Sequence, residues 1–490
     1  MKSALRATLI LSSSSLVSII AGLVSAKVFA VLLGANGLGY MGLLQSLVGF
    51  AGLVAGVGLG TGLVRVGANA LARDNPIRVA ALRKAVWLLF WALGGSTMIL
   101  MIIFRVPISR WMLGSPEHAG SVVLMSLALF FTLASGVQTS ILNTYHRTSS
   151  LARYGILNSI LGASISLVIV WRWGDPGIAL AIIAGSVMSW CIATVILKKE
   201  RIQTLAKVPR CETLEAVRSL LHFGGPYTLS MLVGTGIQLI LPALILHTLG
   251  TESIGYYRAA VAISVNYLGF LLIAMGMDYY PRIASVSHEP TELVHLVNQQ
   301  YRLVLLLAVP IVLATLALAP ILVPLVYSPQ FAPTVDILEW QLLGDLFKFA
   351  SWTLGTVILA RSKSPVIFIV ELIAGINILT TSWLGMRWFG LQGLGIGFLI
   401  TYMVHFIVVW MILRREIRMT WTPLNKRISL LAFIATSLVW VLPRVGLQRL
   451  MTPAALSLAM VIGLGSAYLL WQEIGGREFA RIWLSSRTKA

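Results

Sequence analysis

The sequence has few charged residues, fewer acids than bases, and very few cysteines. Only 11% of its 490 residues are charged while 58% are hydrophobic, and one soluble core cannot hide that much apolar surface. Its two cysteines, Cys191 and Cys211, are too few for a disulfide framework. No two of the seven histidines are spaced i,i+4, and no Ser, His and Asp group suggests itself, so we expect no metal site, no cofactor and no catalytic residue.

The sequence instead contains many long apolar windows. A helix needs about 20 mostly apolar residues to cross the hydrocarbon core of a bilayer, and windows of that length recur along the whole chain. They predict an all-α polytopic membrane protein. We expect about fourteen transmembrane helices, at residues 8–33, 39–64, 85–104, 120–144, 155–171, 177–197, 223–248, 254–280, 303–327, 337–360, 366–386, 391–413, 428–443 and 454–471.

The basic residues that give the net charge of +20 lie mostly in the predicted loops. Basic residues spread over short loops, rather than gathered in one stripe with aromatics, argue against a nucleic-acid partner. With the N-terminus placed in the cytoplasm, most loop Lys and Arg residues lie on the cytoplasmic side. The opposite side has only Arg105, Arg110, Arg172, Arg387, Arg444 and Arg449. This positive-inside pattern predicts that both termini are cytoplasmic.

Two sequence matches at nearly the same offset indicate an internal repeat. The eight residues from Leu33 to Tyr40 resemble the eight from Leu249 to Tyr256, 216 positions later. Arg172-Trp173 likewise corresponds to Arg387-Trp388. The matches predict two pseudo-symmetric six-helix lobes of the same orientation, an arrangement that places a substrate cavity between lobes. A chance match of short Gly-rich turns is the alternative.

These patterns give a domain prediction of four parts. We expect an N-lobe at 1–197, a cytoplasmic linker at 198–222, a C-lobe at 223–413 and a C-terminal extension at 414–490. Apolar residues at helical spacing between charges predict an interfacial amphipathic helix at 212–222, within the linker. The last two spans, in the extension, have no counterpart in either half, and their expected role is packing, lipid contact or dimerisation.

Two stretches carry a resemblance to a known family. One contains Trp340-Gln341-x-x-Gly344-Asp345-x-x-Lys348, followed by Ala360 and Phe368-x-x-Glu371. The other runs from Gly22 to Val66 and contains Lys27 and several glycines. Both are similar to the flippases of O-antigen and enterobacterial common antigen (lipid III) precursors, which are polysaccharide transporters of the multidrug/oligosaccharidyl-lipid/polysaccharide (MOP) exporter superfamily.

The resemblance implies a transporter of the bacterial inner (cytoplasmic) membrane. Such a flippase moves an undecaprenyl-diphosphate-linked oligosaccharide from the cytoplasmic to the periplasmic leaflet, by alternating access between two lobes, for O-antigen-like polysaccharide and lipopolysaccharide biosynthesis. Its implied partners are this lipid-linked substrate and membrane lipids, with a polysaccharide polymerase or chain-length machinery and a coupling ion as further partners to test. The family usually has about twelve spans, so the last two helices depart from its pattern.

Ionisable residues inside spans are costly and supply the candidate site. Four cations can meet a diphosphate: Lys27, Arg65, Arg258 and Lys348. Each of the first three also has a simpler interpretation. Lys27 can snorkel to the interface, Arg258 can act as an interfacial anchor, and Arg65 can belong to the positive-inside set.

A polar stripe marks the tenth predicted span. Gln341, Asp345 and Lys348 are spaced by four and three residues, which places an amide, a carboxylate and an ammonium on one helix face. We expect this stripe to bind substrate or to couple transport to an ion; an Asp345 to Lys348 pair that only holds two helices together is the alternative. Glu371 is a candidate partner for the lysine or a proton carrier. Asp278 is a candidate coupling residue, with a local cap or a local ion pair as the alternative.

Two other functions compete with a flippase. A multidrug or organic-cation antiporter of the same superfamily would favour acids and aromatics in its cavity, whereas the deep positions here include cations. A membrane glycan polymerase or ligase would need a catalytic constellation in a sizeable extramembrane loop. The longest predicted periplasmic loop here is short, from Arg105 to Gly120.

The topology can be tested by cysteine labelling of intact cells, with Cys191 and Cys211 replaced by alanine. Cysteines placed at Ser115 and Thr251 should react with a membrane-impermeant thiol reagent, because both positions are predicted to be periplasmic. Cysteines placed at Ser149 and Thr204 should not react. Labelling of the second pair would overturn the orientation.

Overall fold

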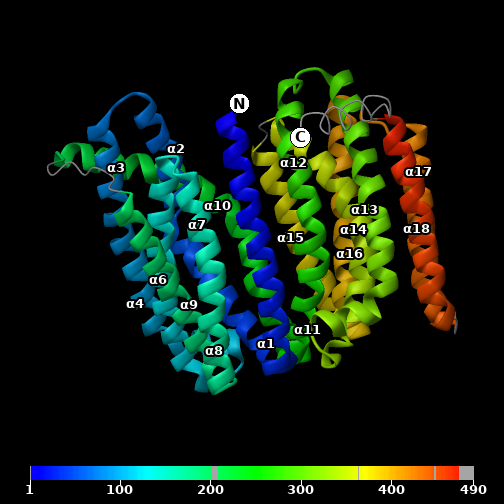
Figure 1. Ribbon diagram of the computed structural model, residues 1–490, viewed down its shortest axis with the longest axis horizontal. Coiled ribbons are helices and arrows are strands. Elements are labelled where there is room, and N and C mark those ends of the chain that lie inside the picture. The colour runs from blue at the N-terminus through cyan, green and yellow to red at the C-terminus, as the bar shows by residue number, and fades with distance from the viewer. Residues whose placement is uncertain (1, 201–207, 362–363, 446–447, 474–490) are drawn as a thin grey trace, which may run out of the picture. The chain divides into compact units, whose positions relative to one another are not determined.

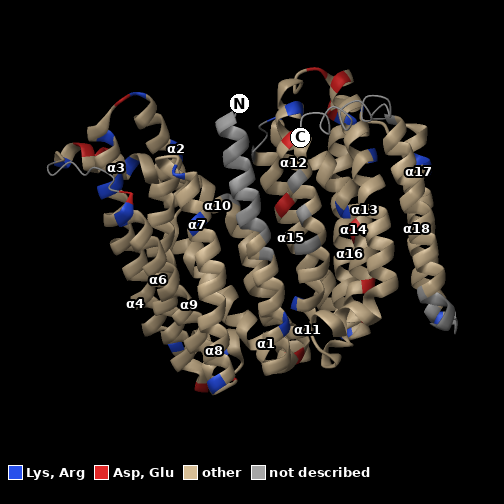
Figure 2. Cartoon of the chain, in the orientation of Figure 1, with Lys and Arg blue, Asp and Glu red and all other residues tan. Residues whose placement is uncertain are grey.

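The computed structural model describes residues 2–200, 208–361, 364–445 and 448–473, and all regular structure in these ranges is helical (Figure 1). This confirms the predicted all-α fold. Twelve helical segments in this part of the chain are long and apolar enough to cross a membrane. Figure 2 shows charged residues concentrated toward the helix ends, with long uncharged stretches between them. The chain is therefore a multi-pass membrane protein, while the number of fourteen spans stays a prediction.

The chain divides into two compact units, each of which is close to half of the sequence. Unit 1 comprises Met1–Gly255 with Val326–Ser328, and unit 2 comprises Tyr256–Leu325 with Pro329–Ala490. The lobe boundaries expected near residues 197 and 223 stay predictions. In unit 1 the helices are α1 (Lys2–Gly56), α2 (Leu59–Ala72), α3 (Pro76–Leu89), η1 (Phe90–Gly94), α4 (Gly95–Ile103), α5 (Arg105–Leu113), η2 (Pro116–His118), α6 (Ala119–Thr144), α7 (Thr148–Leu157), η3 (Asn158–Gly162), α8 (Ala163–Trp173), α9 (Gly177–Lys199) and α10 (Arg210–Leu249).

Unit 2 begins in the middle of α11 and contains the remaining helices of the described chain. The helix α11 (Thr251–Val261) begins in unit 1. The remaining helices are η4 (Ala262–Tyr267), α12 (Leu268–Ser285), α13 (Pro290–Val326), η5 (Pro329–Phe331), α14 (Thr334–Ala360), α15 (Ser364–Phe389), α16 (Gln392–Ile417), α17 (Pro423–Val441), η6 (Leu442–Val445) and α18 (Gln448–Glu473). Three wide π-helical turns, η1, η3 and η4, continue directly into α-helix.

Four glycines with positive φ occur as two pairs that are 216 residues apart. Gly34 (φ 64°, ψ −169°) interrupts α1, and Gly250 (φ 88°, ψ 174°) separates α10 from α11. Gly174 (φ 59°) follows α8, and Gly390 (φ 56°) follows α15. Because this region of φ and ψ is open to glycine almost alone, each sequence match corresponds to a shared backbone break. The internal repeat therefore extends from sequence to backbone conformation.

The two copies of the first repeat also contact each other within unit 1. A methyl group added at Gly39 would overlap the carbonyl oxygen of Thr251, and one added at Gly255 would overlap that of Ala35. Gly39 and Gly255 hold the same position in their repeats, as do Ala35 and Thr251. The contact is thus reciprocal, and it requires a residue without a side chain at both glycine positions.

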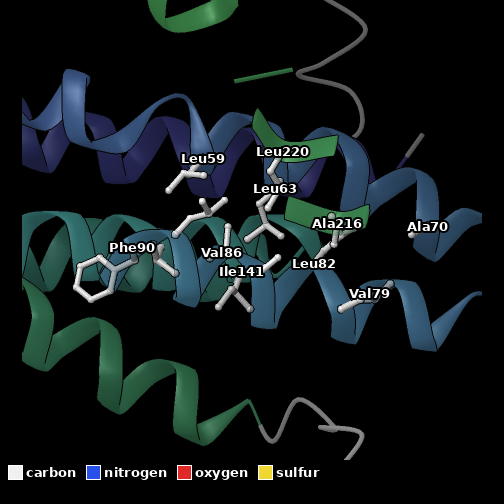
Figure 3. Close-up of a cluster of buried hydrophobic side chains, with 14 of the residues drawn as sticks. Leu59, Leu63, Ala70, Val79, Leu82, Val86, Phe90, Ile141, Ala216 and Leu220 are labelled. Carbon is white, nitrogen blue, oxygen red and sulfur yellow. The ribbon is translucent and has the colours of Figure 1, made fainter. Parts of the chain in front are cut away.

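One apolar core cluster of unit 1 gathers residues from α2, α3, η1, α6 and α10 (Figure 3). Leu63 of α2, Leu82 and Val86 of α3, and Ile141 of α6 pack with Leu220 of α10. Residues 212–222, which we predicted to be an interfacial amphipathic helix, form the first turns of the long helix α10. Arg78 of α3 holds these turns through ion pairs with Glu212 (3.5 Å) and Glu215 (3.1 Å) and a hydrogen bond to Ser219 (2.8 Å).

The reciprocal glycine contact predicts a cost for each added methyl group. We expect Gly39→Ala and Gly255→Ala each to lower the free energy of unfolding by about 1–3 kcal/mol, because an added methyl overpacks a close helix contact. Thermal unfolding of the detergent-solubilised protein measures this. Gly49→Ala in α1 is the matched control, since nothing lies within 4 Å of its added methyl. Equal melting temperatures for the three variants would contradict the contact.

Candidate functional site

Helix α14 carries a charged pair in the interior of unit 2. Asp345 is fully buried, and Lys348 is only 8% exposed. Two glycines bring α14 close to α16 at this depth: an added methyl at Gly344 would lie 2.8 Å from Phe398, and one at Gly395 would lie 2.7 Å from the Trp340 side chain. The small residues thus set the short distance between the two helices, and this places the charged pair beside α16.

Hydrogen bonds satisfy both carboxylate oxygens of Asp345. The Lys348 ammonium donates to Oδ1 at 3.1 Å, and the Ser264 hydroxyl donates to Oδ2 at 2.9 Å. The ammonium also lies 5.7 Å and 5.9 Å from the ring centroids of Phe398 and Tyr402, within the range of cation–π attraction. The pair therefore joins α14 to the π-helical turn η4 and to α16. An ammonium has three N–H donors, and one of them is directed to Asp345.

A cavity of about 320 Å³ lies next to this pair, inside unit 2. Among the described residues, a lysine, a glutamate and a histidine line it: Lys348 of α14, Glu371 of α15 and His405 of α16. Trp352 and Tyr402 contribute aromatic surface, and the rest of the lining is apolar or carries a hydroxyl group. A cavity of this size with a few converging polar groups is typical of a small-ligand site.

Two side chains near the pair have buried polar atoms without partners in the described part of the chain. Both amide atoms of Gln341, one turn before Asp345, lack a hydrogen-bond partner within the described residues. The Nδ1 atom of His405 lacks one as well in that part of the chain. Buried polar groups are normally hydrogen-bonded, so these atoms are available to a ligand or to water.

The other predicted site residues are not among those that line this cavity. Arg65 is exposed on α2, with its guanidinium 4.7 Å from the ring centroid of Phe223. Asp278 is exposed and pairs with Arg282 at 3.2 Å. Lys27 of α1 and Arg258 of α11 are both partly buried. The structure thus brings Lys348 and Glu371 to one cavity, next to Asp345 and Gln341.

Several polar groups of unit 2 were not predicted from the sequence. Ser264 lies in η4, and π-helical turns are frequent at functional sites, but no residue pattern in the sequence marks this turn. His405 is a lone histidine within the apolar span at 391–413, a signal that we left unused. Glu339 of α14 pairs with Arg444 of η6 at 2.8 Å.

The extension packs against the helices of unit 2. Next to the ion pair between Glu339 and Arg444, the ring centroids of Trp340 and Trp440 lie 4.6 Å apart. Asn425, at the start of α17, donates to the side-chain and backbone oxygens of Asn298 in α13, each at 2.9 Å. These contacts agree with a packing role for the first helix of the extension.

Comparisons with known proteins connect this fold to lipid and drug transporters. The family model described as polysaccharide biosynthesis protein matches residues 28–336. The lipid III flippases of Escherichia coli (strain K12) and Shigella flexneri are each 23% identical over 415 residues, which covers 82% of this chain and 96% of the relative. These matches confirm the family resemblance inferred from the sequence.

Solved structures share the fold. The lipid II flippase MurJ, in an inward closed conformation, matches with a TM-score of 0.72 at 15% identity, covering 95% of this chain and 99% of that one. An inward-facing multidrug resistance MATE family transporter of the MOP superfamily matches with a TM-score of 0.63 at 16% identity, covering 84% and 98%. At these identities the likeness shows the fold alone.

The Glu339 to Arg444 pair predicts how the extension stabilises unit 2. Arg444→Ala should lower the free energy of unfolding by about 1.5–3 kcal/mol, because it leaves a largely buried carboxylate without its charged partner. Arg387→Ala is the matched control, since Arg387 also lies over a tryptophan ring but forms no ion pair among the described residues. Equal losses in thermal unfolding of the two variants would show that the ion pair contributes nothing.

Proposed function

The chain belongs to the polysaccharide biosynthesis protein family, and from that premise we propose that it is a flippase for an undecaprenyl-diphosphate-linked oligosaccharide. It would move this substrate from the cytoplasmic to the periplasmic leaflet of the bacterial inner membrane, with both termini in the cytoplasm, to supply O-antigen-like polysaccharide synthesis. The relatives named lipid III flippase support this choice of substrate class. Two lobes would alternate access to the substrate.

The physical need for such a protein follows from the substrate. Each unpaired polar group costs several kcal/mol in hydrocarbon, so a diphosphate and its sugars do not cross unaided. The polyprenyl tail can stay in the bilayer throughout. A flippase must therefore offer polar and cationic groups at membrane depth.

One observation carries the proposal: a buried lysine, held by a buried carboxylate, lines a cavity within the membrane-spanning part of unit 2. A charge in a span is expensive and usually functional. In our proposal the Lys348 ammonium attracts the diphosphate, and Asp345 keeps the lysine charged and oriented while no substrate is bound. Ser264 would hold the Asp345 carboxylate in place during that exchange.

Glu371 and His405 give the same cavity two groups that can take up or release a proton. We propose that they couple the cycle to protons or balance the charge around the substrate. The membrane potential helps in any case, because outward movement of each negative charge across an inside-negative membrane is favoured by about 2.3 kcal/mol per 100 mV. Lys27, Arg65 and Arg258 remain proposed cationic contacts for the substrate along its path.

A second candidate function is an organic-cation antiporter. The observation that favours it is the combination of Glu371 with the aromatic rings of Trp352 and Tyr402 around one cavity, since acids and aromatics bind organic cations. Uptake of a fluorescent organic cation into proteoliposomes under a proton gradient separates the two functions. A flippase should leave the cation outside.

Changing Lys348 tests the proposed site. Lys348→Ala should slow flipping at least about tenfold, because one charged hydrogen bond to the substrate is lost, and Lys348→Arg should retain part of the activity because the charge persists. The measurement is the accumulation of lipid-linked precursor in the cytoplasmic leaflet at equal protein levels. Lys426→Ala, which removes an exposed lysine of α17, is the matched control.

A double variant distinguishes substrate contact from simple charge neutralisation. If Lys348 only neutralises Asp345, then Lys348→Ala combined with Asp345→Ala should restore flipping, because no lone buried charge remains. Contact with the substrate predicts no restoration. Recovery of flipping in the double variant would therefore contradict the proposed role of Lys348.

A further inference from the structure

Unit 1 has an apolar groove that our proposed function does not use. It has a volume of about 530 Å³ and lies between α7 and α9. Its apolar lining includes Ile156 and Leu157 of α7 and Met188, Ile192 and Val195 of α9. Leu157 is 41% exposed and Val195 is 53% exposed. At membrane depth, exposed apolar side chains of this kind contact acyl chains.

The groove is charged at one end only. Arg153, Lys199, Glu200 and Ser150 line that end. The Glu200 carboxylate is already engaged, since Oε2 pairs with Arg147 at 3.1 Å and Oε1 accepts a hydrogen bond from Ser150. Arg153 and Lys199 are both exposed and form no ion pair with any other residue that the structure describes. The open charge at this end is therefore positive.

The length of the groove matches one leaflet. The stretch of α9 from Met188 to Lys199 lines it, and the eleven steps between these residues of α-helix rise about 17 Å. Half of the hydrocarbon core of a bilayer is about 15 Å thick. The charged end adjoins the segment after α9, which the distribution of basic residues predicts to be cytoplasmic. With that orientation, the groove would span the cytoplasmic leaflet, with its cations at the lipid headgroups.

We propose that this groove binds an anionic phospholipid of the cytoplasmic leaflet. One acyl chain would lie along Leu157, Ile192 and Val195, and the phosphate would lie between Arg153 and Lys199. Paired cations at a membrane surface attract anionic headgroups, and charge complementarity selects against a zwitterionic lipid, whose own cation they would repel. Within the ranges that the structure describes, the unpaired groups at the charged end are the N–H donors of Arg153 and Lys199, which suit a phosphate. Free acceptors for sugar hydroxyls are few, because Ser150 is bonded to Glu200 and the Glu200 carboxylate also pairs with Arg147. This favours a phospholipid over a lipid-linked oligosaccharide.

Lipid binding to the full-length protein in detergent tests the proposal. Native mass spectrometry should show tighter binding of dioleoyl phosphatidylglycerol than of dioleoyl phosphatidylcholine. Replacing both cations, with Arg153→Gln and Lys199→Gln, should weaken phosphatidylglycerol binding about 30-fold. Lys198→Gln is the matched control, because Lys198 is an exposed neighbour that does not line the groove, and it should leave the affinity within about twofold of wild type.

A second measurement locates the lipid. Phosphatidylglycerol with a photoactivatable diazirine on one acyl chain should crosslink to peptides of α7 and α9, and Val195→Trp, which fills the groove, should reduce that yield. Equal affinity for the two phospholipids, an equal loss in Lys198→Gln and the double variant, or crosslinks outside α7 and α9 would each overturn the proposal. So would displacement of phosphatidylglycerol by undecaprenyl diphosphate at lower concentration, since the groove would then belong to the transport substrate.

Discussion

A charge inside the hydrocarbon layer must be compensated within the protein, and this constraint organises unit 2. Asp345 is fully buried, and both of its oxygens accept hydrogen bonds, one from Lys348 and one from Ser264. Losing one partner would leave an uncompensated buried charge, which is far more costly than never having placed the pair there. The arrangement of α14, η4 and α16 therefore depends on the network. In our proposal, a diphosphate that enters the cavity takes part in the same compensation, because its negative charge faces the Lys348 ammonium.

Close backbone approach is the second requirement of the fold, and glycine meets it. In unit 2, Gly344 and Gly395 let α14 and α16 approach closely around the charged pair. In unit 1, Gly39 and Gly255 make the reciprocal contact between the two copies of the repeat. Helices in lipid gain little from hydrophobic association, so small residues that permit tight van der Waals packing contribute much of their cohesion. The glycines that the internal repeat shares are thus also the residues that allow its two copies to pack closely.

Much of this arrangement follows from the sequence. The length of the apolar windows predicted an all-α membrane protein. The spacing of Asp345 and Lys348 predicted that they share one face of a span. The repeat predicted that Gly34 and Gly250 are equivalent, and their backbone angles agree. Short motifs also predicted the family, since they depend on residue identity alone.

Other features could not be predicted from one sequence. Helical periodicity gives the face of a helix but not the neighbour that meets it, so the hydrogen bond from Ser264 and the place of His405 in the cavity lining were missed. The π-helical turn that carries Ser264 has no residue signature. The segment at 212–222 has the periodicity of a surface helix, yet Leu220 is fully buried in the core of unit 1, because tertiary packing decides which amphipathic faces are covered.

Transport by the purified protein tests the central claim most directly. Proteoliposomes would carry an undecaprenyl-diphosphate-linked oligosaccharide, with a membrane-impermeant glycosidase added outside and an inside-negative or inside-positive potential imposed. A flippase should make nearly all of the substrate cleavable. Cleavage should be faster when the potential drives the diphosphate outward, toward the glycosidase. In vesicles without the protein, cleavage should stop at the fraction of substrate in the outer leaflet. Cleavage that stops at that fraction in the presence of the folded protein would contradict the account.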